Sequence, residues 1–231
     1  MIIYILGYGR SGTTAVSRAL ERKLNAINLG EVKYIYRSDK DDLLDQYWIK
    51  FKQKEMKVLT DELKSFDNIF GFTKWGKKGR YKKLWQTIFK KMGVHPATEI
   101  IIDSSKTTMD SFMRGIYLYH SFKDVCFILP KRNVLSVIKS MIKGKNSNLE
   151  RGTKRRPVIR LLHVFFLGVP HFLLTNILTN IYKIYGVYHI DLKLLEDEID
   201  HFIEKEKIGK MPKKSVDLPM VYGNRMRLKT R

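Results

Sequence analysis

The segment at residues 2–14 constrains the fold most strongly, because it begins as a buried strand and turns at once into a helix. Residues 2–6 read Ile-Ile-Tyr-Ile-Leu, an unbroken apolar run that is typical of a parallel strand covered on both faces. A glycine-containing turn follows, and apolar side chains then recur at helical spacing over residues 13–24. Unpaired backbone N–H groups and the positive end of the helix dipole converge where such a turn meets its helix. The segment therefore predicts an α/β fold with an anion site at residues 7–14.

The turn differs at one position from the loop that binds nucleoside triphosphates. Gly7 and Gly12 have the spacing of that loop, but Thr13 occupies the place of its lysine. The side chain that would reach the outer phosphates is therefore missing, and Arg10 supplies a cation inside the turn instead. The sequence favours an anion other than a triphosphate, and a turn that serves packing alone is the alternative.

The pattern Gly-x-x-Arg-Ser-Gly-Thr-Thr at residues 7–14 follows an N-terminal strand. It resembles the 5′-phosphosulfate loop of sulfotransferases that use 3′-phosphoadenosine 5′-phosphosulfate (PAPS) as donor. The resemblance implies an α/β fold with a short central parallel sheet flanked by helices, a three-layer sandwich like that of P-loop NTPases. It also implies a single sulfotransferase domain over residues 1–231. The residues expected to hold the 5′-phosphosulfate are Gly9, Arg10, Ser11, Gly12, Thr13 and Thr14.

Charge and cysteine content bear on the partners and the compartment. The chain has 44 Lys and Arg against 23 Asp and Glu, a net charge of +21. This excess favours an anionic partner such as a nucleotide, an acidic glycan, nucleic acid or a membrane surface, although a solvated basic surface accounts for part of it. The one cysteine, Cys126, lies in the apolar run at residues 125–129 and is expected to be a core thiol. No cleavable signal precedes the first strand, so the sequence predicts a cytoplasmic protein.

A second strand is expected at residues 26–29, directly before Gly30-Glu31. It would deliver a carboxylate to the carboxyl edge of the sheet, where ligands bind in open α/β folds. Sulfotransferases similar to this chain carry Gly-Glu here, and the resemblance implies that Glu31 is the general base. A carboxylate can receive the proton that an acceptor hydroxyl loses as it attacks sulfur. The alternative for Glu31 is an ordinary surface residue.

The next buried strand, at residues 99–103, runs directly into an Asp-Ser-Ser-Lys element that ends at Lys106. The element is similar to one found in many sulfotransferases, which implies that Lys106 faces the bridge between phosphate and sulfur. Negative charge grows there as the bond breaks, so a fixed ammonium stabilises the transition state more than the ground state. Arg10 is expected to share this role. The alternative is that a serine of the element only caps the following helix.

A further motif follows the predicted strand at residues 125–129. Arg132 lies just past this strand and Ser140 lies eight residues further on, which resembles the family's 3′-phosphate signature. Eight residues span just over two helical turns, so a loop residue and a helix residue can reach the same phosphate. Arginine offers a planar fork to phosphate oxygens, and serine adds a hydroxyl donor. Ser136, one turn before Ser140, is the weaker substitute.

Two late segments carry the rest of the resemblance. Gly-Asn-x-x-Arg at residues 223–227 resembles an element of bacterial-type sulfotransferases that helps to enclose the adenosine 3′-phosphate, with Arg227 as the matching arginine. A disordered basic tail is the alternative. A late strand is expected at residues 187–191, where His-Ile-Asp-Leu at residues 189–192 departs from the family's Tyr-Glu-Asp-Leu.

The remaining segments are predicted mainly as helices. Helical periodicity extends over residues 41–66, 107–122 and 192–207. The basic run at residues 77–91 is either a cationic rim of the acceptor pocket or a solvated helix face. Residues 161–178 contain no charged side chain and are expected to form a buried helix pair broken near Pro170. Peripheral contact with an anionic membrane is the alternative for this segment.

Together the motifs predict a sulfotransferase that moves a sulfuryl group from PAPS to an acceptor hydroxyl, with a glycan or glycolipid as the expected acceptor. PAPS is the expected co-substrate. No metal is expected, because Arg10 and Lys106 would do the charge work that magnesium performs in kinases. No nucleic acid partner is expected. Two alternatives stay open: a P-loop nucleotide kinase or ATPase-like protein, and a non-catalytic basic protein that binds polyanions.

Overall fold

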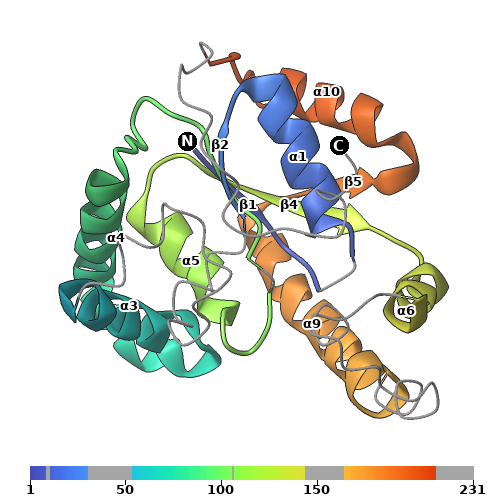
Figure 1. The fold of residues 1–231 in the computed structure, drawn as a ribbon, viewed down its shortest axis with the longest axis horizontal. Helices are drawn as coiled ribbons and strands as arrows, with labels where there is room; N and C mark the ends of the chain where they lie inside the picture. The colour runs from blue at the N-terminus through green and yellow to red at the C-terminus, as the bar shows by residue number, and fades with distance from the viewer. Residues whose placement is uncertain (9–10, 31–53, 106, 144–163, 212–231) are drawn as a thin grey trace.

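The computed structural model describes residues 1–8, 11–30, 54–105, 107–143 and 164–211. Five strands form one parallel sheet in the order β2-β3-β1-β4-β5 (Figure 1). The strands are β1 (Ile2–Ile5), β2 (Ile27–Gly30), β3 (Ile101–Asp103), β4 (Val125–Lys131) and β5 (Val187–Asp191). All five strands expected from the sequence are therefore confirmed.

Strand β1 is the centre of the sheet because both of its faces are covered. Ile2 pairs with Ile101 of β3 and with Val125 of β4. Successive side chains of a strand point to opposite faces, so Tyr4 packs into one hydrophobic cluster and Ile3 into the other. This two-sided burial explains why residues 2–6 are apolar without alternation.

Helices cover both faces of the sheet, and the expected three-layer α/β architecture is confirmed (Figure 1). One face is covered by α1 (Thr13–Leu24) and α10 (Leu195–Lys205). The other face is covered by α3 (Lys54–Asp67), α4 (Lys78–Met92) and α5 (Phe112–Ser121). A 3-10 segment, η4 (Ile69–Lys77), joins α3 to α4, and α6 (Val134–Lys143) follows β4.

Two helices begin later than the sequence pattern indicates, because polar side chains organise the residues before them. Thr108 and Ser111 bond through their side chains at 3.2 Å ahead of α5. Asp191 accepts a bond from the Lys193 backbone N–H at 2.9 Å and begins a 3-10 turn, η7 (Leu192–Leu194), ahead of α10. Such local bonds give the backbone an alternative to the helical ladder.

The helical segment after residue 163 differs from the expected buried pair. A π-helical turn, η5 (Val164–Gly168), continues into α9 (Val169–Ile181) and then into the 3-10 turn η6 (Tyr182–Tyr185). Pro170 does not break the run: it lies in the first turn of α9, directly after the π-helical turn η5.

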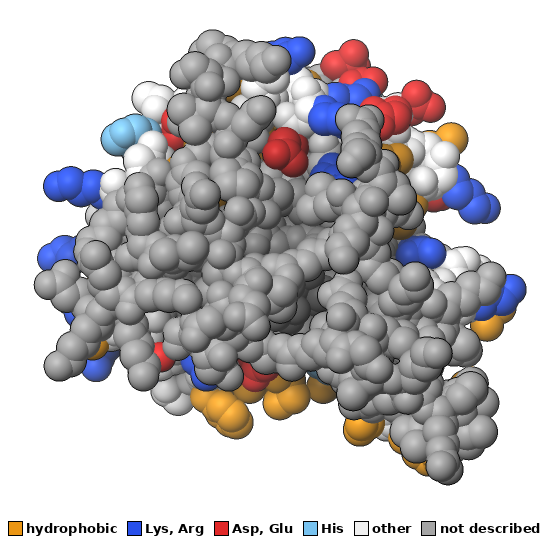
Figure 2. All heavy atoms as spheres, in the orientation of Figure 1, with side chains coloured by type: hydrophobic (Ala, Val, Ile, Leu, Met, Phe, Trp, Pro, Cys, Tyr) orange, Lys and Arg blue, Asp and Glu red, His pale blue; other side chains and the backbone are white. Residues whose placement is uncertain are grey.

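Much of this helical run is exposed, so the prediction of a buried pair is wrong. Only one side of it packs on the fold, and 28% of its most apolar stretch is buried. Within the described residues, Phe165–Tyr185 is the one helix that is long and apolar enough to cross a membrane. Figure 2 shows hydrophobic side chains along the lower edge of the molecule, where Figure 1 places the lower end of α9.

Candidate functional site

All five strands are parallel, so their carboxyl ends lie at one edge of the sheet, and the candidate site is built there. Gly7 follows β1 with φ of 126°, and Gly12 precedes α1 with φ of 105°. Both values lie in a region that side chains other than glycine rarely adopt. Ser11 closes the turn between them, because its hydroxyl donates to the Tyr8 carbonyl at 2.6 Å and its N–H to the same oxygen at 3.1 Å.

The start of α1 is suited to an anion. Gly12 is its N-cap, and no described side chain caps this end or places an acidic group in its first turn. The first N–H groups of a helix lack internal acceptors and carry the positive end of its dipole. Thr13, which stands in place of the lysine of a triphosphate loop, is buried. The helix start is therefore free of side-chain caps and acidic groups among the described residues, and the anion site stays a prediction.

Gly12 also lies close to the segment after β5. A Cβ atom built on it would lie 2.3 Å from Cδ1 of Leu192, which follows β5. The turn after β1 is thus packed directly against the segment after β5. Tyr8 extends the packing in another direction, because its ring lies 5.1 Å from that of His171 and 5.9 Å from that of Phe172 on α9.

The segment after β3 is fastened to the turn after β1. Gly7 donates its N–H to the Thr107 hydroxyl at 3.2 Å, and Thr107 donates its N–H to the Gly7 carbonyl at 2.9 Å. Ser104 donates its N–H to the Gly30 carbonyl at 2.9 Å, which ties the same segment to the end of β2. Thr107 adjoins the candidate residue Lys106, and Gly30 adjoins the candidate residue Glu31. Both adjoining residues are therefore held at this edge of the sheet.

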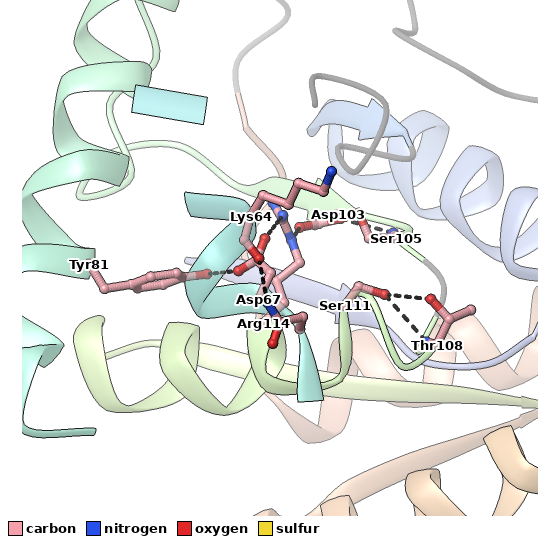
Figure 3. Close-up of polar contacts among 9 residues, drawn as sticks. Lys64, Asp67, Tyr81, Asp103, Ser105, Thr108, Ser111 and Arg114 are labelled. Carbon is pink, nitrogen blue, oxygen red and sulfur yellow. Dashed lines mark hydrogen bonds and ion pairs between the residues drawn. The ribbon is translucent and has the colours of Figure 1, made fainter. Parts of the chain in front are cut away.

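A buried charge network lies beneath this segment (Figure 3). Arg114 of α5 contacts Asp103 through Nε and Asp67 of α3 through Nη1, each at 2.7 Å. All three side chains are 0–3% exposed. The second oxygen of Asp103 accepts the Ser105 N–H at 2.9 Å, and the Tyr81 hydroxyl bonds Asp67 at 3.0 Å. The network fixes the first residues of the Asp-Ser-Ser-Lys element from below.

A cleft of about 610 Å³ joins the turn after β1 to the segment after β4. Gly7, Tyr8 and Ser11 line one part of it, and Arg132 lines another. The described lining also contains three lysines and one carboxylate, namely Lys131, Lys183, Lys193 and Asp191. An excess of cations in a cleft concentrates field lines and favours an anionic ligand.

Sequence reasoning missed the three lysines. Lys131 adjoins Arg132, and Lys193 follows the last strand, so both positions could have been found from the rule that ligands bind at the carboxyl edge. Lys183 gave no such signal, because it reaches the cleft from the helical run before β5.

The two serines of the Arg132 segment are placed differently. Ser136, on the first turn of α6, is among the described residues that line the cleft, and Ser140, one turn further on, is not. Ser140 is partly buried. Its role and that of Ser136 stay predictions.

Several candidate residues lie outside the described part of the chain. They are Gly9, Arg10, Glu31, Lys106 and Arg227. The expected helix at residues 41–53 lies outside it too. Within the part described, no group of three His, Cys, Asp or Glu side chains could hold a metal ion.

His189 of β5 lines the cleft together with Lys131 and Lys183. Burial is the main cause that lowers the pKa of His189, and the positive charges of these two lysines lower its pKa further. Both causes favour the neutral imidazole over the imidazolium. A bound phosphate would offset the lysine charges and favour the imidazolium.

A second cavity, of about 810 Å³, lies at the opposite end of the strands, where Met1, Glu99 and Glu206 contribute to its lining. Cys126 also lines it and is only partly buried, so the expected core thiol is at the rim of the core. Burial, followed by the nearby Glu206 carboxylate, raises the pKa of Cys126 to about 11. A thiol with such a pKa is a poor nucleophile at neutral pH.

We expect Arg114→Met to lower the free energy of unfolding by about 3–5 kcal/mol, because it leaves two buried carboxylates without their cation. Arg80→Met is the matched control. Arg80 pairs with Glu62 at 2.8 Å but is 56% exposed, so its loss should cost about 0–1 kcal/mol. Urea unfolding of both variants measures the difference. Equal losses would contradict the structural role of Arg114.

We expect His189 to make the protein less stable in acid. Its pKa is lowered in the folded state, so the unfolded chain binds more protons from about pH 6.5 down to the folded pKa, and stability is lost as the pH falls through that window. His189→Gln should weaken this dependence in urea unfolding at about pH 8 and about pH 5.5. Part of the pH dependence should remain in this variant, because burial also lowers the pKa of His120. An unchanged dependence would exclude His189 as a source.

Comparison with known proteins gives a fold relationship. No protein-family model matches the chain, and no curated protein matches its sequence. Eleven chains of solved structures match. One is a sulfotransferase domain from the curacin biosynthetic pathway, with a TM-score of 0.50 and 15% sequence identity over 96% of this chain and 80% of that one. At this identity the match establishes the fold: the chain has the α/β architecture of a sulfotransferase domain.

Proposed function

We propose that this chain is a PAPS-dependent sulfotransferase. The observation that carries the proposal is that two segments predicted to bind anions line a single cleft: the turn that leads into α1, and the Arg132 segment after β4. A donor with a phosphosulfate at one end and a separate 3′-phosphate needs two such elements. Thr13 in place of the triphosphate-loop lysine disfavours ATP. The sulfotransferase-like fold supports the same assignment.

In the proposed reaction the acceptor oxygen attacks sulfur while Glu31 takes the hydroxyl proton. The new O–S bond forms as the bond from sulfur to the 5′-phosphate oxygen breaks, and adenosine 3′,5′-bisphosphate leaves with the electron pair. Arg10 and Lys106 balance the negative charge that grows on the leaving oxygen. The two hydrogen bonds between Thr107 and Gly7 support this role for Lys106, because they hold Thr107, the next residue in the chain, at the turn after β1.

The 3′-phosphate of the donor is assigned to Arg132, to a serine of α6 and to Arg227. Arg132 and Ser136 line the cleft, and Lys131 and Lys193 add positive charge to it. We propose a hydroxyl on a glycan or glycolipid as acceptor, from the basic character of the chain. The alternative, a protein that only binds polyanions, would bind through the same positive charge but without preference for a 3′-phosphate.

The first test is whether the cleft reads the 3′-phosphate. Adenosine 3′,5′-bisphosphate should stabilise the protein in a thermal-shift titration far more than AMP or ATP does. Arg132→Ala should weaken the bisphosphate about 10- to 100-fold, the usual worth of a charge-assisted bond. Arg22→Ala is the control, because Arg22 is 71% exposed and pairs with Glu196. Equal stabilisation by AMP would refute the proposed donor, and a salt-sensitive response without nucleotide preference would favour the polyanion-binding protein.

The second test concerns the base. Glu31→Gln should bind adenosine 3′,5′-bisphosphate normally but lose sulfate transfer by about 100-fold or more, the usual contribution of a general base. Transfer of radioactive sulfate from labelled PAPS to a cell-envelope extract measures the activity. Glu196→Gln, a surface carboxylate that is 55% exposed, is the control. Full transfer by Glu31→Gln would remove Glu31 from the proposed role.

A further inference from the structure

The helical run of η5, α9 and η6 has three distinct faces. One face is buried against the sheet and includes Phe172, Thr175 and Tyr182, each 0–4% exposed. A second face, at spacings of four and three residues, presents Asn176, Asn180 and Lys183 to the cleft of the candidate site. The run therefore both packs on the core and forms a wall of the site.

The third face is apolar and exposed. It consists of Leu174, Ile177, Ile181 and Ile184, which recur at spacings of three, four and three residues and are 37–77% exposed. Phe165, Phe166 and Leu167 of η5 extend it and are 52–73% exposed. A monomeric soluble protein rarely leaves so many large apolar side chains together in water, and such patches mark an interaction surface.

The buried face excludes a membrane-spanning arrangement of this helix in the folded protein. Tyr182 is fully buried beside Phe127 of β4, with ring centroids 5.1 Å apart, and its hydroxyl donates to the Phe112 carbonyl. A helix held on the sheet in this way can lie along a surface but cannot be surrounded by lipid. Its exposed face is suited to lie in the plane of a membrane.

The charges around the apolar face favour an anionic membrane over a second protein. No acidic residue occurs in the sequence between Arg151 and Tyr188, and Lys183 lies on the row next to the apolar face. Arg155, Arg156 and Arg160 come before the face in the sequence and lie outside the described residues. Basic side chains that flank an apolar helix face are attracted to anionic lipid headgroups at about 1 kcal/mol each.

A second apolar projection lies on the same edge of the molecule. Phe70 and Phe72 of η4 are 69% and 59% exposed, and Lys74 and Lys77 lie in the same segment. Figure 2 shows hydrophobic side chains along the lower edge of the molecule, where Figure 1 places both the teal helical turn after α3 and the lower end of α9. Two projections on one edge are suited to an extended, flat partner.

We infer that the apolar face of η5, α9 and η6 docks this protein on an anionic lipid surface, and that the acceptor hydroxyl is carried by a lipid headgroup. The second part rests on the proposed sulfotransferase function. By helical spacing, the row of Asn176, Asn180 and Lys183 lies between the buried face and the apolar face. Docking of the apolar face therefore brings the wall of the cleft to the headgroup level.

Flotation with phosphatidylglycerol vesicles at about 50 mM salt tests the docking. Wild-type protein should float with these vesicles, and the double variant Ile177→Asn/Ile184→Asn should lose binding by about 10-fold or more, because two large apolar side chains no longer enter the interface. Leu194→Asn is the matched control, since Leu194 is 56% exposed but lies on η7. It should float like wild type.

Three results would overturn the docking: wild type that does not float, a double variant that floats equally well, or a dimer that the double variant converts to a monomer without any vesicle binding. The last result would assign the face to a second copy of the chain. Bisphosphate binding, measured separately by thermal shift, shows that each variant is folded. Wild-type protein that floats but does not bind the bisphosphate would contradict the proposed function and leave the surface assignment standing.

The acceptor class is tested with labelled PAPS and vesicles of total polar lipid from the cell envelope. Sulfate should pass to intact lipid, and the deacylated, water-soluble headgroups of the same lipids should be poorer acceptors by about 10-fold or more, because they are not concentrated at the docked surface. Equal transfer to both preparations, or transfer to neither by protein that binds the bisphosphate, would overturn the lipid acceptor.

Discussion

The parallel pairing of β1 between β3 and β4 is the constraint on which the rest of this structure depends. It brings the segments that follow β1, β3 and β4 to one edge of the sheet. The first two of these segments meet there although Gly7 and Thr107 are 100 residues apart in the chain. Backbone bonds then join these segments directly, as between Gly7 and Thr107. The turn after β1 is therefore part of the sheet's own hydrogen-bond framework and not a loop added to it.

Arg114 adds a second level of order. An ion pair in a dry core contributes little net stability compared with well-packed apolar residues, but removing one partner is costly. Here the arginine joins α5 to the ends of β3 and α3, and the ring of Trp85 lies 4.6 Å from its guanidinium carbon. The arrangement specifies one position for the residues that lead to Lys106.

The sequence was informative where a local pattern and a general rule agree. Buried strands are apolar without alternation, and a glycine turn between a strand and a helix is typical of an anion site, so the sheet and the turn at Gly7 were predictable. The place of Arg132 in the lining of the cleft was predictable because it follows a strand at the carboxyl edge of the sheet. The lining of the cleft by Lys183 was not, because it depends on how η6 packs on the sheet, which no local pattern encodes. The same holds for the partners of Arg114, which are far apart in the chain.

The error at residues 161–178 has a related cause. An uncharged apolar segment can be a core helix or an interfacial one, and composition does not distinguish them. Only the packing of Phe172 and Tyr182 on one side, with Ile177 and Ile184 exposed on the other, shows that this helix is not buried in the core.

The contact between Gly12 and Leu192 also bears on how the protein is made. Leu192 supports the turn before α1 but is separated from it by 180 residues and follows an edge strand, β5. During synthesis the turn after β1 emerges from the ribosome early, yet the Leu192 side chain that packs against it is added much later. The packing around this turn is therefore complete only when the last strand has joined the sheet.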